Sequence, residues 1–130
     1  MKRCMLLNVL LWVLGVSAFA QTQGIAFETS RSWKKVVEKA REEGKLIFVD
    51  CYADWCGPCK MTAPELEAFS QEYDDVKVCK INVDESADLA AMYGIMSIPT
   101  MILVKNGKEA DRHVGGCEKA DIRAFCDKNM

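Results

Sequence analysis

The stretch that decides the fold reads Asp54-Trp55-Cys56-Gly57-Pro58-Cys59-Lys60-Met61, at residues 54–61. Before it comes the continuous apolar run Leu46-Ile47-Phe48-Val49, which predicts a strand covered on both faces. After it, residues 59–72 have the pattern of a helix. Two cysteines separated by two residues therefore lie between a buried strand and the start of a helix, and this context predicts thiol chemistry.

The patterns on both sides of this stretch predict alternating helices and strands. Further strands are expected over residues 76–81, 100–104 and 112–114, and further helices over 33–43, 87–93 and 119–128. Asn106-Gly107 predicts a hairpin turn, and residues 21–29 an extended arm or short edge strand. The element order favours the α/β class, with a central mixed β-sheet flanked by helices on both faces.

Several side chains are expected to form the core beneath these helices. Pro64 should kink the helix over residues 59–72, because proline lacks an amide hydrogen and crowds the preceding turn. The inward residues are expected to be Met61, Leu66 and Phe69 in that helix, Trp33, Val36, Val37 and Ala40 in the first helix, and Ile122, Phe125 and Cys126 in the last.

Length and composition narrow the classes of protein. The chain has 130 residues, enough for one domain, and 50% of them are hydrophobic while 28% are charged. Its 17 basic and 19 acidic side chains leave a formal net charge of −2, which gives no electrostatic reason to expect nucleic acid as a partner. Seven cysteines indicate thiol chemistry, metal binding or disulfides, and the single histidine, His113, excludes His-rich metal sites.

The first twenty residues have the pattern of a secretory signal peptide. Lys2 and Arg3 precede an apolar run over residues 5–16, and Ser17-Ala18-Phe19-Ala20 closes it. A retained membrane anchor is the alternative, but the run is short against the roughly 20 residues that span a bilayer. We therefore expect cleavage after Ala20, a single domain over residues 21–130, and a periplasmic or secreted protein.

The Cys-x-x-Cys motif carries the chemistry. Cys56 is expected at a helix N-terminus, where unpaired amides and the helix dipole lower the pKa of a thiol and make it a better nucleophile. Cys59, one turn further on, can attack the mixed disulfide that Cys56 forms, and Pro58 suits the first helical turn. A zinc site would need two further spaced ligands, haem attachment would need histidine at Lys60, and a structural disulfide would gain little from so short a loop.

The residues around this motif closely resemble those of the thioredoxin family. Ala63-Pro64 extends the match with the active-site segment of thioredoxins, and residues 31–44 resemble the lead-in helix of secreted thioredoxin-like proteins. The likeness covers nearly all of residues 45–130 and continues through Asn82-Val83-Asp84, Tyr93-Gly94-Ile95, Ile98-Pro99-Thr100, Lys105-Asn106-Gly107 and Val114-Gly115. The resemblance implies the thioredoxin fold and dithiol–disulfide exchange through a WCGPCK active site in a secreted or periplasmic protein. It implies no bound cofactor and no metal.

The same resemblance implies roles for residues outside the motif. Asp50 matches the family's buried carboxylate, whose raised pKa would let it accept the proton of Cys59, and Lys80 matches the lysine near that acid. A position at a strand end in water is the alternative for Asp50, and the apolar residues 46–49 before it favour burial. Pro99 matches a cis-proline that would leave the backbone of Ile98 to pair with an extended substrate.

The expected substrate-binding surface surrounds the two cysteines. Tyr52 stands where thioredoxins commonly have tryptophan, and Gly115 with Val114 is expected to form the opposite wall of the groove. The residues expected to bind substrate are Trp55, Gly57, Pro58, Ile98, Pro99 and Gly115.

Four further cysteines follow residue 50. Cys51, Cys79 and Cys126 lie at positions expected to face the core, where a thiol behaves as a small hydrophobe. Cys117 follows Gly115-Gly116 and is expected to be more exposed, which leaves open a second disulfide or a regulatory thiol.

The sequence thus predicts a protein-disulfide reductase that acts on disulfide-containing exported proteins. A monomer is expected. The resemblance to the family implies that a membrane-embedded electron donor of the DsbD or CcdA type reduces the cysteine pair again after each reaction. Two alternatives stay open: a periplasmic thiol oxidase or disulfide isomerase using the same pair, and a non-catalytic binding module that holds partners through Trp55 and Ile98.

Overall fold

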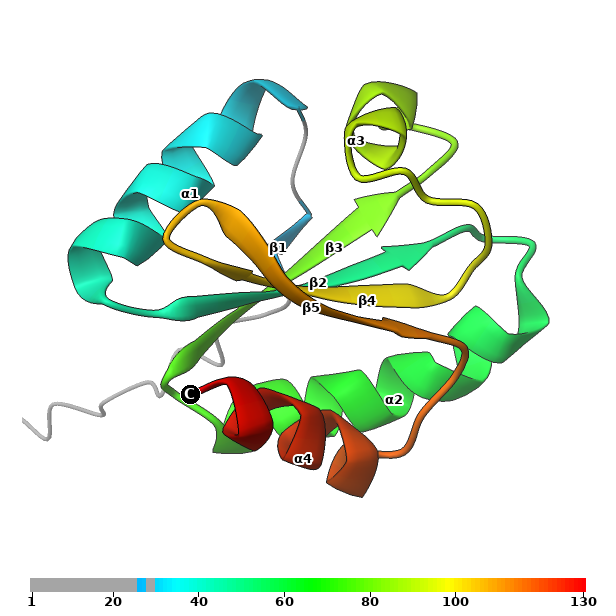
Figure 1. Cartoon of the computed structure of the whole chain (residues 1–130). Coiled ribbons are helices and arrows are strands. Elements are labelled where there is room, and N and C mark those ends of the chain that lie inside the picture. Colours follow the sequence, from blue (N-terminus) through cyan, green and yellow to red (C-terminus); the bar gives the residue numbers. More distant parts are fainter. Residues whose placement is uncertain (1–25, 28–29) are drawn as a thin grey trace, which may run out of the picture.

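The computed structural model describes residues 26–27 and 30–130, which form a mixed five-stranded sheet with helices on both faces (Figure 1). This confirms the expected fold class. The elements in chain order are β1 Ala26–Phe27, α1 Ser30–Glu43, β2 Leu46–Tyr52, α2 Gly57–Glu72, β3 Val76–Asn82, α3 Ala87–Met92, β4 Thr100–Lys105, β5 Lys108–Val114 and α4 Lys119–Asn129.

The sheet is built around β2. Its strand order is β1-β3-β2-β4-β5, with β1 and β2 parallel to β3 and with β4 antiparallel to both β2 and β5. β2 extends three residues beyond the expected end at Val49, and residues 46–51 are buried. The extension has a physical reason, because Asp50 and Cys51 pair with residues of both neighbouring strands.

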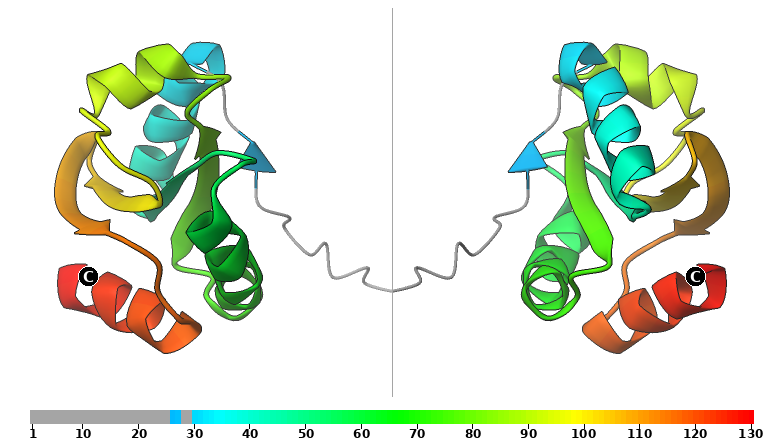
Figure 2. Two further views of the ribbon diagram at one scale, coloured as in Figure 1. Left: turned by 90° about the vertical axis from the view of Figure 1, so that its right-hand side faces the viewer. Right: turned by 90° about the vertical axis from the view of Figure 1, so that its left-hand side faces the viewer.

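Helices lie on both faces of the sheet (Figure 2), and a cluster of buried hydrophobic side chains lies between the sheet and the helices on each face. α1 and α3 cover one face, and α2 and α4 cover the other. The first layer contains Trp33, Val36, Ala40, Ile47, Val49, Cys51, Cys79, Ile81, Leu89, Ile102 and Val104. The second contains Leu46, Phe48, Leu66, Phe69, Val76, Val78, Met101, Leu103, Ile122 and Cys126. Even-numbered residues of β2 therefore face α2, because side chains alternate along a strand.

α2 differs from the expected helix in two respects. It begins at Gly57, two residues earlier than expected, although it runs through Pro64 and ends at Glu72 as expected. The expectation that Met61 points inward is wrong, since its side chain is 78% exposed. The buried residues of α2 are Cys59, Thr62, Leu66 and Phe69, whose spacing of three or four residues defines one helix face and leaves Met61 off it.

The last hairpin is longer than expected and contains a β-bulge. Asn106 and Gly107 adopt φ values of 52° and 79°, which suit a two-residue turn, so that Lys108 already pairs with Lys105. The register shifts further along, where Glu109 lies opposite Val104 and Asp111 lies opposite Leu103. One residue, at position 110, is therefore extra, and the alternation of β5 changes face there.

Only part of what was expected for residues 1–29 can be compared with the structure. Within the segment expected to form an extended arm or short edge strand, residues 26–27 form the edge strand β1, which pairs with β3 at Ala26↔Cys79 and Phe27↔Lys80. The expected signal peptide, residues 1–20, lies outside the described residues. Within the described part of the chain, every helix is too short or too polar to cross a bilayer.

Candidate active site

The two motif cysteines lie where the central strand passes into α2. Cys56 is the N-cap of the helix, and its Sγ accepts a hydrogen bond from the backbone N–H of Cys59 at 3.2 Å. The two cysteines form a disulfide with an S–S distance of 2.09 Å, and Pro58 occupies the first helical turn. The expected position of Cys56 at a helix N-terminus is therefore confirmed, including a donor aimed at its sulfur.

The disulfide packs into a small apolar cluster beneath an exposed surface. Cys56 and Cys59 are each 5% exposed and pack with the buried Ala53, while Gly57 and Pro58 are exposed. The side chains packed against this cluster are Tyr52, Val83 and Ile98. Ile98, which precedes β4, therefore packs against the disulfide, as expected.

Trp55 stands beside the pair as an exposed side chain held by a hydrogen bond. It is 71% exposed, and its Nε1–H donates to Asp84 Oδ2 at 2.9 Å. Asp84 is in turn oriented by its own backbone N–H, which donates to Asn82 Oδ1 at 3.0 Å. Sequence reasoning missed this contact, and the only signal was the Asn82-Val83-Asp84 tripeptide within the family resemblance.

The loop before β4 and the end of β5 meet next to the helix start. The Ile98–Pro99 peptide bond is cis, and the carbonyl oxygen of Pro99 accepts a hydrogen bond from the N–H of Gly115 at 2.9 Å. A Cβ atom at Gly116 would lie 3.1 Å from Thr62 Oγ1. The segment after β5 therefore lies against the first turns of α2.

Asp50 and Lys80 form an ion pair on the face of the sheet covered by α2. They are direct partners in the β2–β3 register, with Lys80 Nζ 3.7 Å from Asp50 Oδ2. Asp50 is 1% exposed, which confirms the expected burial, and Lys80 Nζ also lies 4.4 Å from the Tyr52 ring centroid. Within the described part of the chain, Asp50 Oδ1 has no hydrogen-bond partner.

The pKa of the buried Asp50 carboxyl group is raised. Burial raises the pKa of Asp50 from 3.8 to about 6, and the positive charge of Lys80 opposes the rise without cancelling it. A carboxyl group with a pKa close to the ambient pH can both accept and release a proton. Asp50 is therefore chemically suited to proton transfer on the α2 side of the sheet.

The other described cysteines carry thiols rather than a second disulfide. Cys51, Cys79 and Cys126 are buried, as expected, and burial raises the pKa of Cys51 and of Cys126 to about 12. Cys117 is more exposed than these three, but its Sγ lies 3.1 Å from Met101 Sδ, and burial raises its pKa to about 11. A raised pKa disfavours the reactive thiolate, so these features do not favour a regulatory role for Cys117.

No metal centre accompanies the disulfide among the residues that the structure describes. None of their His, Cys, Asp and Glu side chains form a group of three or more that could hold a metal ion.

A family model, curated sequences and solved structures of thioredoxins match this chain. The thioredoxin family profile matches residues 24–128. The chain is 44% identical over 85 residues to a thioredoxin of Pseudomonas aeruginosa, which covers 65% of this chain and 79% of the relative. It is 38% identical over 91 residues to thioredoxin H2 of Arabidopsis thaliana, covering 70% of this chain and 68% of that protein. The crystal structure of a Nicotiana alata thioredoxin is similar with a TM-score of 0.74 and 42% identity, covering 82% of this chain and 91% of the other.

Proposed function

The chain belongs to the thioredoxin family, and we propose that it reduces disulfides, with exported proteins as its substrates because residues 1–20 have the pattern of a signal peptide. It is a thiol–disulfide oxidoreductase of the thioredoxin type with a Cys56–Cys59 pair. The observation that carries the proposal is the hydrogen bond from the Cys59 N–H to Cys56 Sγ at the start of α2. That donor stabilises negative charge on the sulfur, which is the charge that a nucleophilic thiolate carries.

The first step is attack by the Cys56 thiolate on one sulfur of the substrate disulfide. A bond forms between Cys56 Sγ and that sulfur while the substrate S–S bond breaks, and the second substrate sulfur leaves as a thiolate. Trp55 and Ile98 supply apolar contacts beside the reacting sulfurs, since Trp55 is exposed and Ile98 packs on the cysteine cluster. The product of this step is a mixed disulfide between Cys56 and the substrate.

The second step is attack by Cys59 on Cys56 Sγ. Cys59 must lose its proton first, and ionised Asp50 accepts it. The Cys56–Cys59 disulfide then forms and the substrate sulfur leaves. In sum the cysteine pair loses two electrons and two protons, and the substrate gains both and becomes a dithiol.

The N-terminal sequence supports a proposal for the compartment in which this reaction takes place. Residues 1–20 have the pattern of a signal peptide, so we propose a periplasmic or secreted protein that begins at Gln21. We propose that a membrane-embedded donor of the DsbD or CcdA type returns two electrons to the Cys56–Cys59 disulfide. N-terminal sequencing of the exported protein tests the first point, because a start other than Gln21 contradicts the proposed cleavage.

The test of the chemistry is reduction of insulin, with dithiothreitol as the electron source. Cys56→Ser should abolish the reduction, and Cys59→Ser should accumulate a mixed disulfide that non-reducing electrophoresis detects. Cys117→Ser is the matched control and should retain the wild-type rate. Normal turnover by the Cys56→Ser protein would overturn the assignment.

The direction of electron flow is tested by the reduction potential of the pair. A Gly-Pro dipeptide between the cysteines resembles reducing members of the family, so we expect a value near the −270 mV or so of thioredoxin in a glutathione titration. A value near about −120 mV, typical of a strong thiol oxidant, would reverse the proposed direction.

A further inference from the structure

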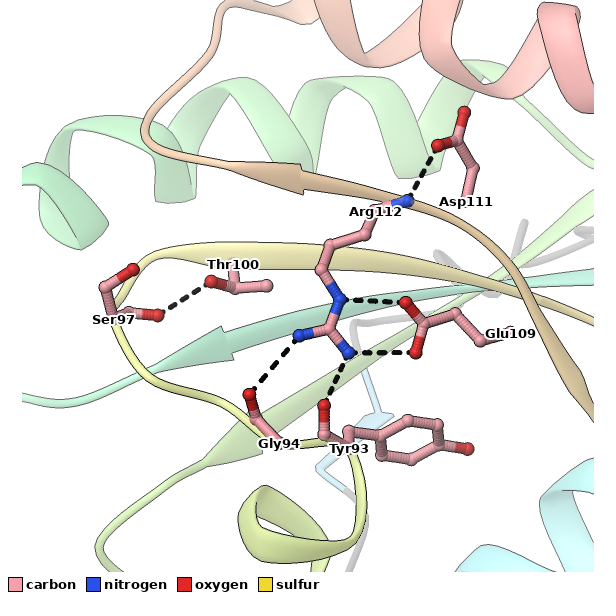
Figure 3. Close-up of polar contacts among 7 residues, drawn as sticks. All are labelled: Tyr93, Gly94, Ser97, Thr100, Glu109, Asp111 and Arg112. Atoms are coloured by element: carbon pink, nitrogen blue, oxygen red, sulfur yellow. Dashed lines mark hydrogen bonds and ion pairs between the residues drawn. The ribbon is translucent and has the colours of Figure 1, made fainter.

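Arg112 extends from β5 to the backbone that follows α3 (Figure 3). Its Nη2 donates to the carbonyl oxygen of Tyr93, and its Nη1 donates to that of Gly94 at 3.4 Å. Tyr93 is the C-cap of α3, and carbonyl groups at the end of a helix lack intrahelical partners. The guanidinium group therefore fixes the start of the segment that leads from α3 to β4.

Glu109 holds the guanidinium group in this orientation. Its Oε1 accepts from Arg112 Nε at 2.8 Å, and its Oε2 accepts from Arg112 Nη2 at 2.9 Å. Residues three apart on a regular strand point to opposite faces, but the β-bulge at position 110 changes the alternation between them. The bulge thus allows Glu109 and Arg112 to meet as a bidentate pair, which is a geometrically specific arrangement.

The segment fixed by Arg112 ends at the disulfide. The Ile95 N–H donates to the carbonyl oxygen of Ala90 at 2.9 Å, and the carbonyl oxygen of Ser97 accepts from Thr100 Oγ1 at 2.7 Å. Between these two anchors lies Met96, whose side chain is 95% exposed, and next to Ser97 lies Ile98, which packs on the cysteine cluster. Arg112 therefore anchors the beginning of this segment and Thr100 anchors its end.

We propose that Arg112, oriented by Glu109, is a positioning residue for substrate docking. It holds residues 93–98 so that Met96 and the backbone of Ile98 face the substrate in one fixed arrangement. This inference rests on the proposed disulfide exchange and adds a residue that determines how the substrate is held. The side-chain hydrogen bonds of Arg112 go to the segment and to Glu109, so its loss should weaken substrate binding and leave the sulfur chemistry intact.

The kinetic test compares Arg112→Met and Arg112→Lys with wild type in insulin reduction. Because a segment that is no longer held must be ordered by the substrate, KM for insulin should rise about five- to tenfold in Arg112→Met while kcat stays within about twofold. Arg112→Lys keeps the charge but loses the bidentate geometry, so a smaller rise is expected. Lys108→Met, which removes one positive charge from the exposed start of β5, is the matched control and should leave KM unchanged.

The structural test is amide hydrogen exchange of Ile95, which needs no activity. Exchange at Ile95 should accelerate at least about fivefold in Arg112→Met, while an amide in central strand β2, such as that of Val49, keeps its wild-type rate. An unchanged KM, or an unchanged Ile95 rate beside a raised KM, overturns the proposal. If Arg112→Met does not fold, the same two measurements on Arg112→Lys decide. A wild-type protein that fails to reduce insulin refutes the proposed function instead, and the Ile95 measurement still tests the anchoring.

Discussion

Replacing Asp50 with asparagine should make the oxidised protein more stable at neutral pH. Burial raises the pKa of Asp50 from 3.8 to about 6, so folding disfavours the ionised carboxylate. Each tenfold change in an ionisation constant corresponds to about 1.4 kcal/mol, which gives a penalty of about 3 kcal/mol above pH 6. That figure already includes the attraction to Lys80, because the raised pKa is the net result of both effects.

The sign of the effect fixes its pH window. Below pH 3.8 the carboxyl group is protonated in both the folded and the unfolded chain, and asparagine offers no advantage. Between pH 3.8 and about 6 the unfolded chain releases the proton while the native protein retains it, so wild-type stability falls as the pH rises. Above about pH 6 both states are ionised, and the advantage of Asp50→Asn stays constant at about 3 kcal/mol.

Urea unfolding of both proteins at pH 7.5 and pH 4.0 measures this difference. At pH 7.5 the variant's midpoint should lie roughly 1–3 M urea above that of wild type, given a slope of about 1–3 kcal/mol per molar urea. At pH 4.0 the difference should fall below about 1 kcal/mol. Asp74→Asn, in the exposed turn before β3, controls for loss of a surface carboxylate. An equal advantage at both pH values, or a less stable variant at pH 7.5, refutes the reasoning.

Three further predictions concern the sulfur, the tryptophan and the core. In the reduced protein, iodoacetamide should alkylate Cys56 at pH 6.5 at least about tenfold faster than free cysteine, because the helix start favours the thiolate; an equal rate contradicts the mechanism. Asp84→Ala removes the hydrogen-bond acceptor of Trp55 Nε1–H, so KM for insulin should rise about two- to fivefold. The free energy of unfolding in urea should fall by at most about 1.5 kcal/mol. An unaltered KM would exclude a role of this hydrogen bond in substrate binding. Leu66→Ala should cost about 2–5 kcal/mol and Met61→Ala less than about 0.5 kcal/mol, because only Leu66 is buried; similar costs would place both in the core.

Local sequence patterns were sufficient to predict much of the site. The apolar run over residues 46–49 favoured burial of Asp50 over a strand end in water, and the structure confirms its burial. The position of Cys56 at a helix start followed from the strand before it and the helix pattern after it. These features depend on residues close in sequence, where periodicity and turn chemistry are informative.

Local sequence patterns could not predict several features that depend on contacts between distant elements. Met61 is as apolar as Leu66, and only the position of the sheet decides which of them faces it. The contact between Arg112 and the backbone of Tyr93 requires a β-bulge, and no turn residue marks it, since position 110 is alanine. The partner of the Trp55 indole lies 29 residues away, beyond the reach of any helical or strand period.

The outer strand β5 has a consequence for association between copies of the protein. An exposed edge strand with a regular backbone and apolar side chains can pair with a strand of another molecule. β5 instead carries charges of both signs, at Lys108, Glu109, Asp111 and Arg112, and its bulge interrupts the spacing of the outward backbone groups. We therefore expect this rim of the sheet to resist intermolecular β-pairing and fibril growth even when the protein is concentrated.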